Sequence, residues 1–438
     1  MIPFMNSNRA VYSNAFWMMG EKIISIFGLI FVTSYVAKYV GPNIFGQIAL
    51  ATSLFQISIV VSQLGSDVLI FKRISKNNLS GIRLIISTLP IRFLLYLIVS
   101  VPVVFFSHKS NDIIGLVFII ACFLSCFFNS LDVFSIYYDA RLESKKNTII
   151  NVIGLIISLC LRWFIAFFNL DVVFLAIPIV LTGFLPFIFR FILFYKNFGI
   201  YKVKRKHKKK YVRYLLFTGL TFVISSVSVA LYTRISILSL GYFFDNSAVG
   251  IFSVAVSLAA SWSFICNAFI TSTLPSIFSE RVGEVAITKT ANLNVLILAV
   301  SIPIIIFICS FGYFFISMLY GENYLSAYPP LVILSIATML SSLGVISSRF
   351  IAHYSGYSFL SKKMLAVVVC SFILNIPLVY YYGLIGAAVA TLLTECISLT
   401  VFNYLFMNGI VFNMHKKVFS LTLLKNAIQS IKKIRCRR

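Results

Sequence analysis

Six basic side chains interrupt the long apolar stretches of this chain, and they are its clearest candidates for chemistry. They are Lys22, Arg92, Arg162, Arg190, Arg234 and Arg349. A charge near the centre of a lipid bilayer costs about 2.5–3.5 kcal/mol on insertion scales, so it usually faces a protein interior or a water-filled cavity. Arg190 and Arg349 lie close to expected helix ends, and their long side chains are expected to reach the interface.

The four deeper cations have a different expected role. Lys22, Arg92, Arg162 and Arg234 lie at several depths along their apolar stretches. Guanidinium and ammonium groups form strong charge-assisted hydrogen bonds with anions. We therefore predict that these four residues bind substrate and line a path for an anion. The alternative for each is packing within the protein interior.

Acidic side chains are scarcer, with 12 Asp and Glu against 37 Lys and Arg. Glu395 lies near the middle of the last apolar stretch, where a carboxyl group is expected to be protonated or paired. We predict that Glu395 couples transport to protons or sodium ions, with pairing to a basic residue as the alternative. Asp67 and Asp132 are expected to mark helix ends. Gln56 and Gln63 are expected either to bind polar groups of a substrate or to join neighbouring helices.

Signals of enzymatic chemistry are weak. The chain has four histidines and eight cysteines, without the spacing of a metal site, and it has no nucleotide-binding loop. Cys122 and Cys126 are expected to pack as small apolar groups. We predict no enzyme activity, no metal site and no cofactor. The net charge of +25 does not indicate nucleic acid as a partner, because the basic residues flank apolar stretches; membrane lipids are the expected partners.

Composition places the chain among membrane proteins, since 60% of its residues are apolar and 11% are charged. Runs of about 20 apolar residues match a ~30 Å hydrocarbon layer, and lipid cannot satisfy the unpaired backbone of a sheet edge. The sequence therefore predicts an all-α membrane protein with about 12 transmembrane helices. They are expected near residues 15–37, 44–68, 84–106, 113–135, 149–168, 172–195, 214–240, 248–275, 291–319, 328–352, 364–382 and 385–411.

Basic residues alternate between the gaps that separate these stretches. The gaps on one side hold 29 of the 37 Lys and Arg, and the gaps on the other side hold only Lys38 and Lys109. Basic loops stay in the cytoplasm, so both termini are expected to be cytoplasmic and the number of spans even. The first apolar run carries Glu21 and Lys22 and has no small-residue cleavage site, so no cleavable signal peptide is expected.

The longest basic loop divides the predicted spans into two groups of six. We predict an N-terminal lobe at 1–195, a basic cytoplasmic linker at 196–213, a C-terminal lobe at 214–411 and a basic cytoplasmic tail at 412–438. Because six is an even number, both lobes start on the same side of the membrane. Such lobes would be related by a pseudo-two-fold axis along the membrane normal.

Two further patterns refine this organisation. Segments 46–54 and 250–258 share Gly, Ala, Ser and Leu at matching positions, which supports an internal repeat. The apolar side chains of 421–431 fall on one helical face, which indicates an interfacial amphipathic helix or a frayed basic tail. The outer loops are too short to form a domain, and this disfavours an enzyme that holds a polar substrate outside the membrane.

Three segments resemble bacterial polysaccharide flippases. Ala37–Gly46 lies between the first two expected spans, Leu319–Tyr324 precedes the tenth, and Tyr382–Thr391 surrounds the last outer turn. Their order and spacing over residues 11–411 are similar to those of the Wzx-type O-antigen/polysaccharide flippases of the multidrug/oligosaccharidyl-lipid/polysaccharide exporter superfamily. The cavity residues of that family do not lie in a motif that aligns here, so the resemblance assigns no site residue.

This resemblance implies two six-helix lobes around a cationic cavity. It also implies export of an undecaprenyl-pyrophosphate-linked oligosaccharide, the O-antigen unit, from the cytoplasmic to the periplasmic leaflet by alternating access, with ion coupling in some members. The implied location is the bacterial inner membrane, and an O-antigen polymerase and a chain-length regulator are the implied protein partners.

Three alternatives to a polysaccharide flippase stay open. A cation-coupled multidrug exporter of the same superfamily is disfavoured by the basic character of the deep charges. A lipid II flippase usually carries two further helices. A membrane-embedded O-antigen polymerase is disfavoured by the short outer loops.

Overall fold

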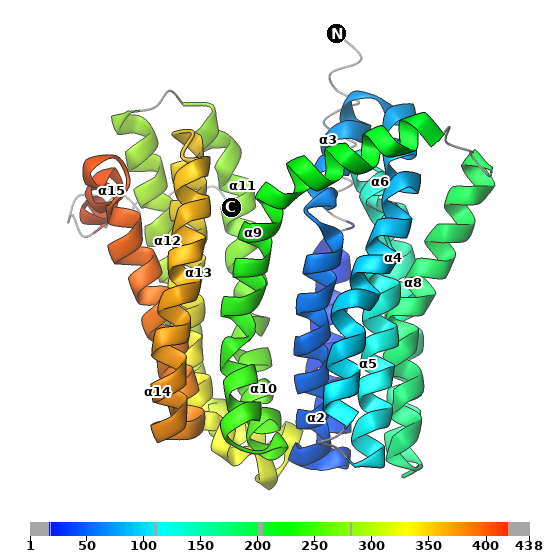
Figure 1. Ribbon diagram of the computed structural model, residues 1–438. Coiled ribbons are helices and arrows are strands. Elements are labelled where there is room, and N and C mark those ends of the chain that lie inside the picture. The colour runs from blue at the N-terminus through cyan, green and yellow to red at the C-terminus, as the bar shows by residue number, and fades with distance from the viewer. Residues whose placement is uncertain (1–16, 18, 109–111, 200–204, 281–282, 419–438) are drawn as a thin grey trace, which may run out of the picture. The chain divides into compact units, whose positions relative to one another are not determined.

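Helix is the one regular secondary structure in the described part of the chain, as the computed structural model shows (Figure 1). The chain divides into two compact units, Met1–Arg234 and Ile235–Arg438, here called unit 1 and unit 2. The structure describes residues 17, 19–108, 112–199, 205–280 and 283–418.

Unit 1 begins with a helical segment from Met19 that passes through a π-helix, η1 (Gly28–Val32), into α2 (Thr33–Gln63). The elements that follow are α3 (Ser66–Lys76), α4 (Asn78–His108), α5 (Ile113–Leu131), α6 (Phe134–Ala140), α7 (Ser144–Phe167), η2 (Val172–Leu175) and α8 (Ala176–Phe198). The first part of α9 (Arg205–Phe243) completes the unit.

Unit 2 takes up the remainder of α9 and ends in a short helix. Its elements are α10 (Asn246–Ser261), α11 (Ser263–Phe278), α12 (Glu284–Tyr320), η3 (Glu322–Ala327), α13 (Tyr328–His353), α14 (Tyr357–Ile397), η4 (Ser398–Phe402), η5 (Met407–Gly409) and α15 (Ile410–Val418). The element η4 is a second π-helix. The expected amphipathic face at 421–431 lies outside the described residues.

Ten helical stretches in the described part of the chain are long and apolar enough to cross a membrane, so this is a multi-pass membrane protein. Two of them, Met19–Gln63 and Tyr357–Phe402, have 45 and 46 residues, about twice what one crossing needs. Each is broken by a glycine with a left-handed backbone, Gly41 with φ 75° and Gly383 with φ 53°. An α-helix of L-residues does not continue through such a conformation.

These observations confirm the predicted all-α membrane fold. The arrangement of about 12 transmembrane helices in two six-helix lobes stays a prediction. The breaks at Gly41 and Gly383 support it, because each would divide one long helical stretch into two membrane crossings.

The boundary between the units falls inside a helix, whereas the sequence placed the boundary in a linker at 196–213. The first part of α9 packs on unit 1, where Leu215 is buried in a cluster with residues of α3, α4, α6 and α8. The hydroxyls of Tyr211 and Ser80 also lie 3.1 Å apart. Apolar composition marks where the lipid-facing part of a helix starts, but it does not show that preceding basic turns continue the same helix.

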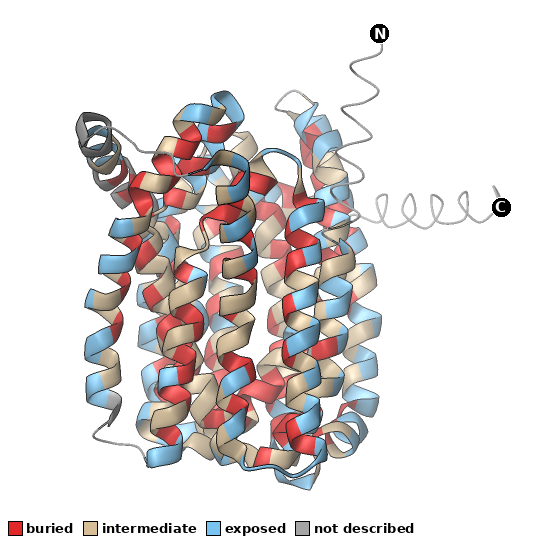
Figure 2. Cartoon of the chain, turned by 90° about the vertical axis from the view of Figure 1, so that its right-hand side faces the viewer, coloured by how far each residue is buried: buried red, intermediate tan, exposed pale blue. Residues whose placement is uncertain are grey.

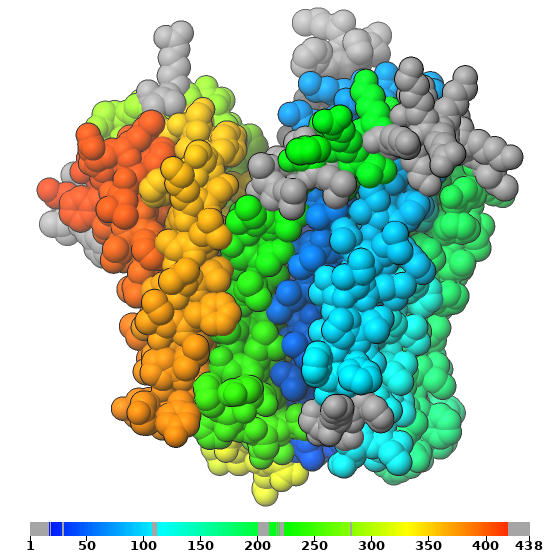
Figure 3. Space-filling view, in the orientation of Figure 1, coloured from blue at the N-terminus to red at the C-terminus, as the bar shows by residue number. Residues whose placement is uncertain are grey.

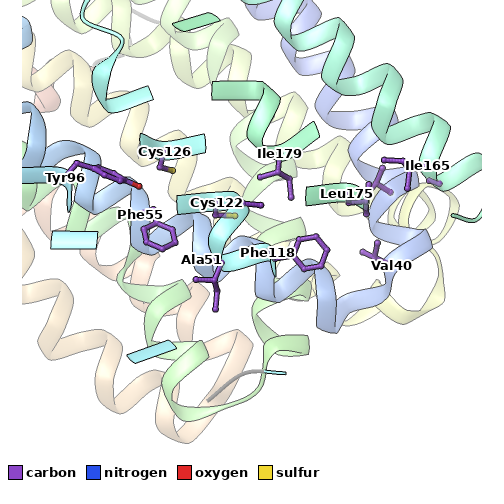
Figure 4. Packing of buried hydrophobic residues seen from close by; sticks show 14 residues of the cluster. Val40, Ala51, Phe55, Tyr96, Phe118, Cys122, Cys126, Ile165, Leu175 and Ile179 are labelled. Carbon is purple, nitrogen blue, oxygen red and sulfur yellow. The ribbon is translucent and has the colours of Figure 1, made fainter. Parts of the chain in front are cut away.

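The core of unit 1 forms where α2, α4, α5, α7 and α8 meet. Figure 4 shows the rings of Phe55 and Tyr96 beside the thiols of Cys122 and Cys126. Both cysteines are buried and free, in agreement with the expected packing role. Small residues such as Ala51 let these helices approach closely, because lipid provides no hydrophobic force between helices and packing must replace it.

One close approach in this core requires glycine. Gly183 on α8 faces α5, and a Cβ atom at this position would lie 2.2 Å from the carbonyl oxygen of Ser125. The neighbouring hydroxyls of Ser125 and Thr182 are 3.1 Å apart and join the same two helices. The contact between α5 and α8 therefore depends on the absence of a side chain at position 183.

Large apolar side chains also cover the outside of unit 1. On α4, Phe106 is 70% exposed and Ile98 is 66% exposed, which suits a surface that meets lipid rather than water. Figure 2 shows buried and exposed residues alternating along the helices, because one face of each helix turns inward. In Figure 3, α4 and α5 lie side by side on the outer face of unit 1, and a shallow apolar hollow beside Phe105 and Leu116 runs between them.

In unit 2, the short helix α15 packs through Val411 and Met414 against the ends of α12 and α13. His415 fixes this arrangement, because its Nδ1 lies 3.1 Å from the Tyr404 hydroxyl and its Nε2 lies 3.3 Å from the Ser347 hydroxyl. Burial lowers the pKa of His415 to about 4. The imidazole is therefore neutral at pH 7 and donates one of these hydrogen bonds while accepting the other.

Candidate functional site

Arg92 on α4 lies inside unit 1 and is engaged on every side of its guanidinium. Only 2% of the residue is exposed. Its Nε donates to the Ser66 hydroxyl at 3.1 Å, and its Nη1 donates to the Ser130 carbonyl at 3.1 Å. Its Nη2 forms an ion pair with Asp67 at the start of α3. These contacts use the donors that an anionic substrate would need.

Arg190 on α8 is held in the same way and is 3% exposed. Its guanidinium forms an ion pair with Asp132, which follows α5. Its Nε donates to the Asn147 side-chain oxygen at 3.0 Å, and its Nη2 donates to Asn151. Asn151 in turn donates to the Glu21 carboxylate at 2.8 Å, so the network reaches the first helical segment.

The expectation that Arg190 reaches the membrane interface is wrong. A buried arginine needs a charge partner and hydrogen bonds, because desolvation penalises an unpaired charge. Asp67 and Asp132 provide these partners in addition to their positions at helix ends. Burial raises the pKa of Asp132, and the guanidiniums of Arg190 and Arg92 oppose that shift.

Arg162 on α7 differs from these two arginines. Its Nε is buried and has no hydrogen-bond partner, and no ion pair of Arg162 is found in the described part of the chain. The side chain is only partly buried. Its guanidinium is therefore less fully engaged by the described residues than those of Arg92 and Arg190 are.

The remaining basic residues of the apolar stretches lie on surfaces. Lys22 is exposed in the first helical segment, and its neighbour Glu21 carries the hydrogen bond to Asn151. Arg349 is exposed near the end of α13, as expected for a side chain that reaches the interface. The role of Lys22 in a substrate path stays a prediction.

Arg234 on α9 lines a pocket of about 420 Å³, and all residues of this pocket belong to unit 1. The pocket is lined from α2 and α9 by Gln56, Ile57, Val60, Gln63, Ser225, Ser226, Val229, Ala230, Thr233 and Arg234. Gln56 and Gln63 are seven residues apart and therefore project from the same face of α2. No side-chain hydrogen bond of Arg234, Gln56 or Gln63 is found among the described residues. We call this feature the Arg234 pocket.

The chemistry of the Arg234 pocket suits an anion that also carries hydroxyl groups. One guanidinium provides five donors in a planar fork. Two amides and the hydroxyls of Ser225 and Ser226 provide both donors and acceptors, and no carboxylate lines the pocket. The structure therefore brings together three residues that the sequence singled out separately, and it does not bring Arg92 to them.

Glu395 lies in unit 2, in the second half of α14 and directly before the π-helix η4. Lys363, in the first half of α14, is a buried cation of the same element. The sequence placed Lys363 in a cytoplasmic gap, but the residue lies inside α14 and is 4% exposed. The sequence around Lys363, which follows Ser361 and Lys362, gives no sign that the Lys363 side chain is buried.

No group of three or more His, Cys, Asp or Glu residues that could hold a metal ion occurs in ranges 19–108, 112–199, 205–280 and 283–418.

Comparison with protein families gives a match over more than half of the chain. Residues 11–280 match the family described as "Polysaccharide biosynthesis protein". A curated relative, "Probable low-salt glycan biosynthesis flippase Agl15" of Haloferax volcanii, is 24% identical over 209 residues. The matching region makes up 46% of this chain and 44% of that protein, so the similarity spans less than half the length of the relative.

Solved structures of similar fold cover nearly the whole chain. A lipid II flippase MurJ in an inward closed conformation has a TM-score of 0.60 at 13% identity, covering 95% of this chain and 93% of that chain. An inward-facing multidrug resistance MATE family transporter of the MOP superfamily has a TM-score of 0.58 at 16% identity, covering 93% and 96%. The chain therefore belongs to the polysaccharide biosynthesis protein family and is a multi-pass membrane protein with the fold of MOP superfamily flippases and transporters.

Proposed function

We propose that this protein is a flippase that moves an undecaprenyl-pyrophosphate-linked oligosaccharide, the O-antigen unit, from the cytoplasmic to the periplasmic leaflet of a bacterial inner membrane. The observation that carries the proposal is the Arg234 pocket, in which a guanidinium lies beside two amides. None of these three side chains has a side-chain hydrogen bond among the described residues. A pyrophosphate with sugars needs charge-assisted hydrogen bonds and hydroxyl-binding groups in one place. The family match and the named flippase relative support the same substrate class.

In this proposal Arg234 binds a phosphate oxygen, and Gln56 and Gln63 bind sugar hydroxyls. Arg162 is a second anion-binding group of unit 1, because its Nε has no hydrogen-bond partner among the described residues. This proposal gives Arg92 no contact with the substrate, since its donors bind Ser66, Ser130 and Asp67. Twelve spans with both termini in the cytoplasm, alternating access and ion coupling through Glu395 complete the proposal.

The proposed protein partners are an O-antigen polymerase and a chain-length regulator, which would act on the exported unit. A multidrug exporter of the same superfamily is the second candidate, because the MATE transporter shares the fold. A cationic drug would require acidic groups in the pocket, and the lining of the Arg234 pocket has none.

The proposal is tested by complementation of a strain that lacks its own polysaccharide flippase. The chain should restore surface polysaccharide, and its absence should leave lipid-linked units facing the cytoplasm. Single, unpolymerised units on the surface of the deletion strain would indicate a polymerase instead. Drug resistance without restored polysaccharide would favour the multidrug exporter.

The pocket is tested by Arg234→Ala. A hydrogen bond to a charged group contributes about 1.5–3 kcal/mol, so export should fall at least about ten-fold while the melting temperature in detergent stays unchanged. Arg349→Ala removes an exposed arginine outside the pocket and serves as the matched control. Equal export by both variants would remove the Arg234 pocket from the substrate path.

A further inference from the structure

The helix that carries the two glutamines of the Arg234 pocket ends in an unfavourable backbone conformation. Helix α2 ends at Gln63, and the next two residues, Leu64 and Gly65, have left-handed φ angles of 48° and 60° before α3 begins. This conformation is disfavoured for a leucine, so it persists only where the surrounding structure determines it. Leu64 is buried in a cluster that includes Leu215 of α9. We call these two residues the α2–α3 turn.

Ser66 closes the α2–α3 turn from the interior of unit 1. The residue is fully buried, and its hydroxyl donates a hydrogen bond to the Gln63 carbonyl. The same hydroxyl accepts hydrogen bonds from Nε and Nη2 of Arg92, with a distance of 3.1 Å for Nε. A serine hydroxyl has one donor and two acceptor positions, so these three contacts use all of them. Arg92 therefore fixes a side chain that joins the start of α3 to the end of α2.

The guanidinium of Arg92 is itself anchored by two further contacts. Its Nη1 donates to the Ser130 carbonyl of α5 at 3.1 Å, and its Nη2 pairs with the Asp67 carboxylate in the first turn of α3. The planar fork of an arginine can serve several acceptors at once, whereas a lysine has a single ammonium group. The carboxylate of Asp67 balances the buried charge. Arg92 therefore connects α3, α4 and α5 beside the α2–α3 turn.

The second wall of the Arg234 pocket, helix α9, packs on the same turn. A Cβ atom at Gly219 would overlap the carbonyl oxygen of Leu64, so the α9 backbone lies directly against the turn. Ser225 and Ser226 of the pocket follow Gly219 by about two helical turns. Gln63, from the first wall, directly precedes the turn. Both walls of the pocket therefore depend on where the α2–α3 turn lies.

We propose that Arg92 is a positioning residue for the Arg234 pocket, because it holds the α2–α3 turn through Ser66 and thereby fixes Gln63 and the packing of α9. The proposal rests on the proposed role of this pocket in substrate binding. Arg92 itself does not touch the substrate and acts through the turn. The charge that the sequence placed on an anion path thus serves that path indirectly.

The primary test needs no ligand and uses purified protein without native cysteines, in which Gln63→Cys reports on the pocket by its rate of reaction with a soluble maleimide. Ser66→Ala removes the link between Arg92 and the turn and leaves Asp67 to balance the charge. It should raise this rate about two- to ten-fold, the factor by which one lost hydrogen bond shifts a local opening equilibrium. Arg92→Lys should act in the same direction. Gln56→Cys, two turns earlier in α2, should keep its rate.

A matched control separates positioning from a general loss of stability. Arg190 is also a buried arginine paired with an aspartate, Asp132, but its contacts lie on α5 and α7 and not at the α2–α3 turn. Arg190→Lys should lower the melting temperature about as much as Arg92→Lys and leave the Gln63→Cys rate unchanged. Ser66→Ala decides the test alone if Arg92→Lys does not accumulate in the membrane.

The second test measures export in the complemented flippase-deficient strain. Ser66→Ala should lower export about two- to ten-fold, the effect of one hydrogen bond. The double variant with Gln63→Ala should lose less than the product of the two single effects, because residues that act through one contact are not additive.

Three results would overturn the proposal. They are an unchanged Gln63→Cys rate in Ser66→Ala, an equal rise of that rate in Arg190→Lys, and single effects on export that multiply in the double variant. Failure of the wild type to restore polysaccharide, together with the expected maleimide rates, would instead reject the proposed flippase substrate and support the positioning role of Arg92.

Discussion

The arginines inside unit 1 separate into two kinds by their partners. Arg92 and Arg190 each form an ion pair with an aspartate, whereas Arg162 and Arg234 have no such partner among the described residues. The sequence identified all four as charges in apolar stretches, but it could not show the pairing. Asp67 is 25 residues from Arg92, and Asp132 is 58 residues from Arg190, so these pairs depend on the tertiary packing of the helices. The scarcity of acidic residues was the one feature of the sequence that could have suggested which aspartates pair with these arginines.

At this scale we expect Asp132→Asn to lower the free energy of unfolding by about 3 kcal/mol, because Arg190 would remain as a buried charge without a counter-charge. Thermal unfolding in detergent measures the effect. Asp245→Asn is the control, since Asp245 is exposed and caps α10 through the backbone N–H of Ala248, a role that asparagine also performs. Equal melting temperatures for the two variants would show that the pair with Arg190 contributes nothing.

At the scale of elements, the lengths of the apolar stretches and the positions of charged residues predicted the long helices well. They predicted the ends of the helices and the contacts between them poorly. The short helices α3 and α6 were absent from the prediction. They have 11 and 7 residues, respectively, and are too short to cross a membrane. α9 starts well before its apolar part. Close contacts such as that of Gly183 with α5 were also invisible, since they depend on which helix lies opposite.

Gly183→Ala should therefore destabilise the protein by about 1–3 kcal/mol, the usual cost of overpacking a core. The new methyl group would meet a backbone carbonyl, which cannot rotate away as a side chain can. Gly344→Ala is a matched control in α13, where no atom lies within 4 Å of the added Cβ and alanine is the better helix former. Thermal unfolding that ranks the two variants in the opposite order would contradict this packing.

The docking of α15 should depend on pH. The pKa of His415 is lowered to about 4 by burial, against about 6.5 in an unfolded chain. The unfolded state therefore binds a proton first as pH falls. The stability associated with His415 is fully present above about pH 6.5 and is lost down to about pH 4, by up to about 3 kcal/mol.

Hydrogen exchange of residues 410–418 at pH 7 and pH 5 measures this loss. The protection factor, which corrects the exchange rate for the intrinsic pH dependence of amide exchange, should fall at the lower pH in the wild type. His415→Gln should show a smaller change because glutamine does not titrate. Equal pH dependence in both proteins would exclude His415 as its source.

At the scale of the whole molecule, charge bias and short gaps predicted a multi-pass all-helical protein, and the family and fold comparisons agree. The sequence could not place the boundary between the units, because α9 carries the chain across it as a continuous helix. The bias in Lys and Arg predicts which gaps between the spans face the cytoplasm. The breaks at Gly41 and Gly383 are two positions where this predicted topology can be tested.

In a variant without native cysteines, Asn43→Cys and Leu384→Cys should react with a membrane-impermeant maleimide in intact cells. Both positions follow a glycine break that would form an outer turn in a chain with twelve crossings. Lys145→Cys, in an expected cytoplasmic gap, should react only after the membrane is permeabilised. Protection of both outer positions in intact cells would reject the twelve-span topology.

The π-helix η4 also bears on how this protein tolerates changes in length. A π-turn accommodates one residue more than an α-turn, and η4 lies between Glu395 and Asn403. Deleting one residue from Ser398–Phe402 would restore α-helical geometry without breaking the helix. Because the π-turn already absorbs the extra residue, this deletion would leave Glu395 and Asn403 on nearly their present faces. Natural length variants at this turn should therefore keep both the fold and the relative orientation of these two side chains.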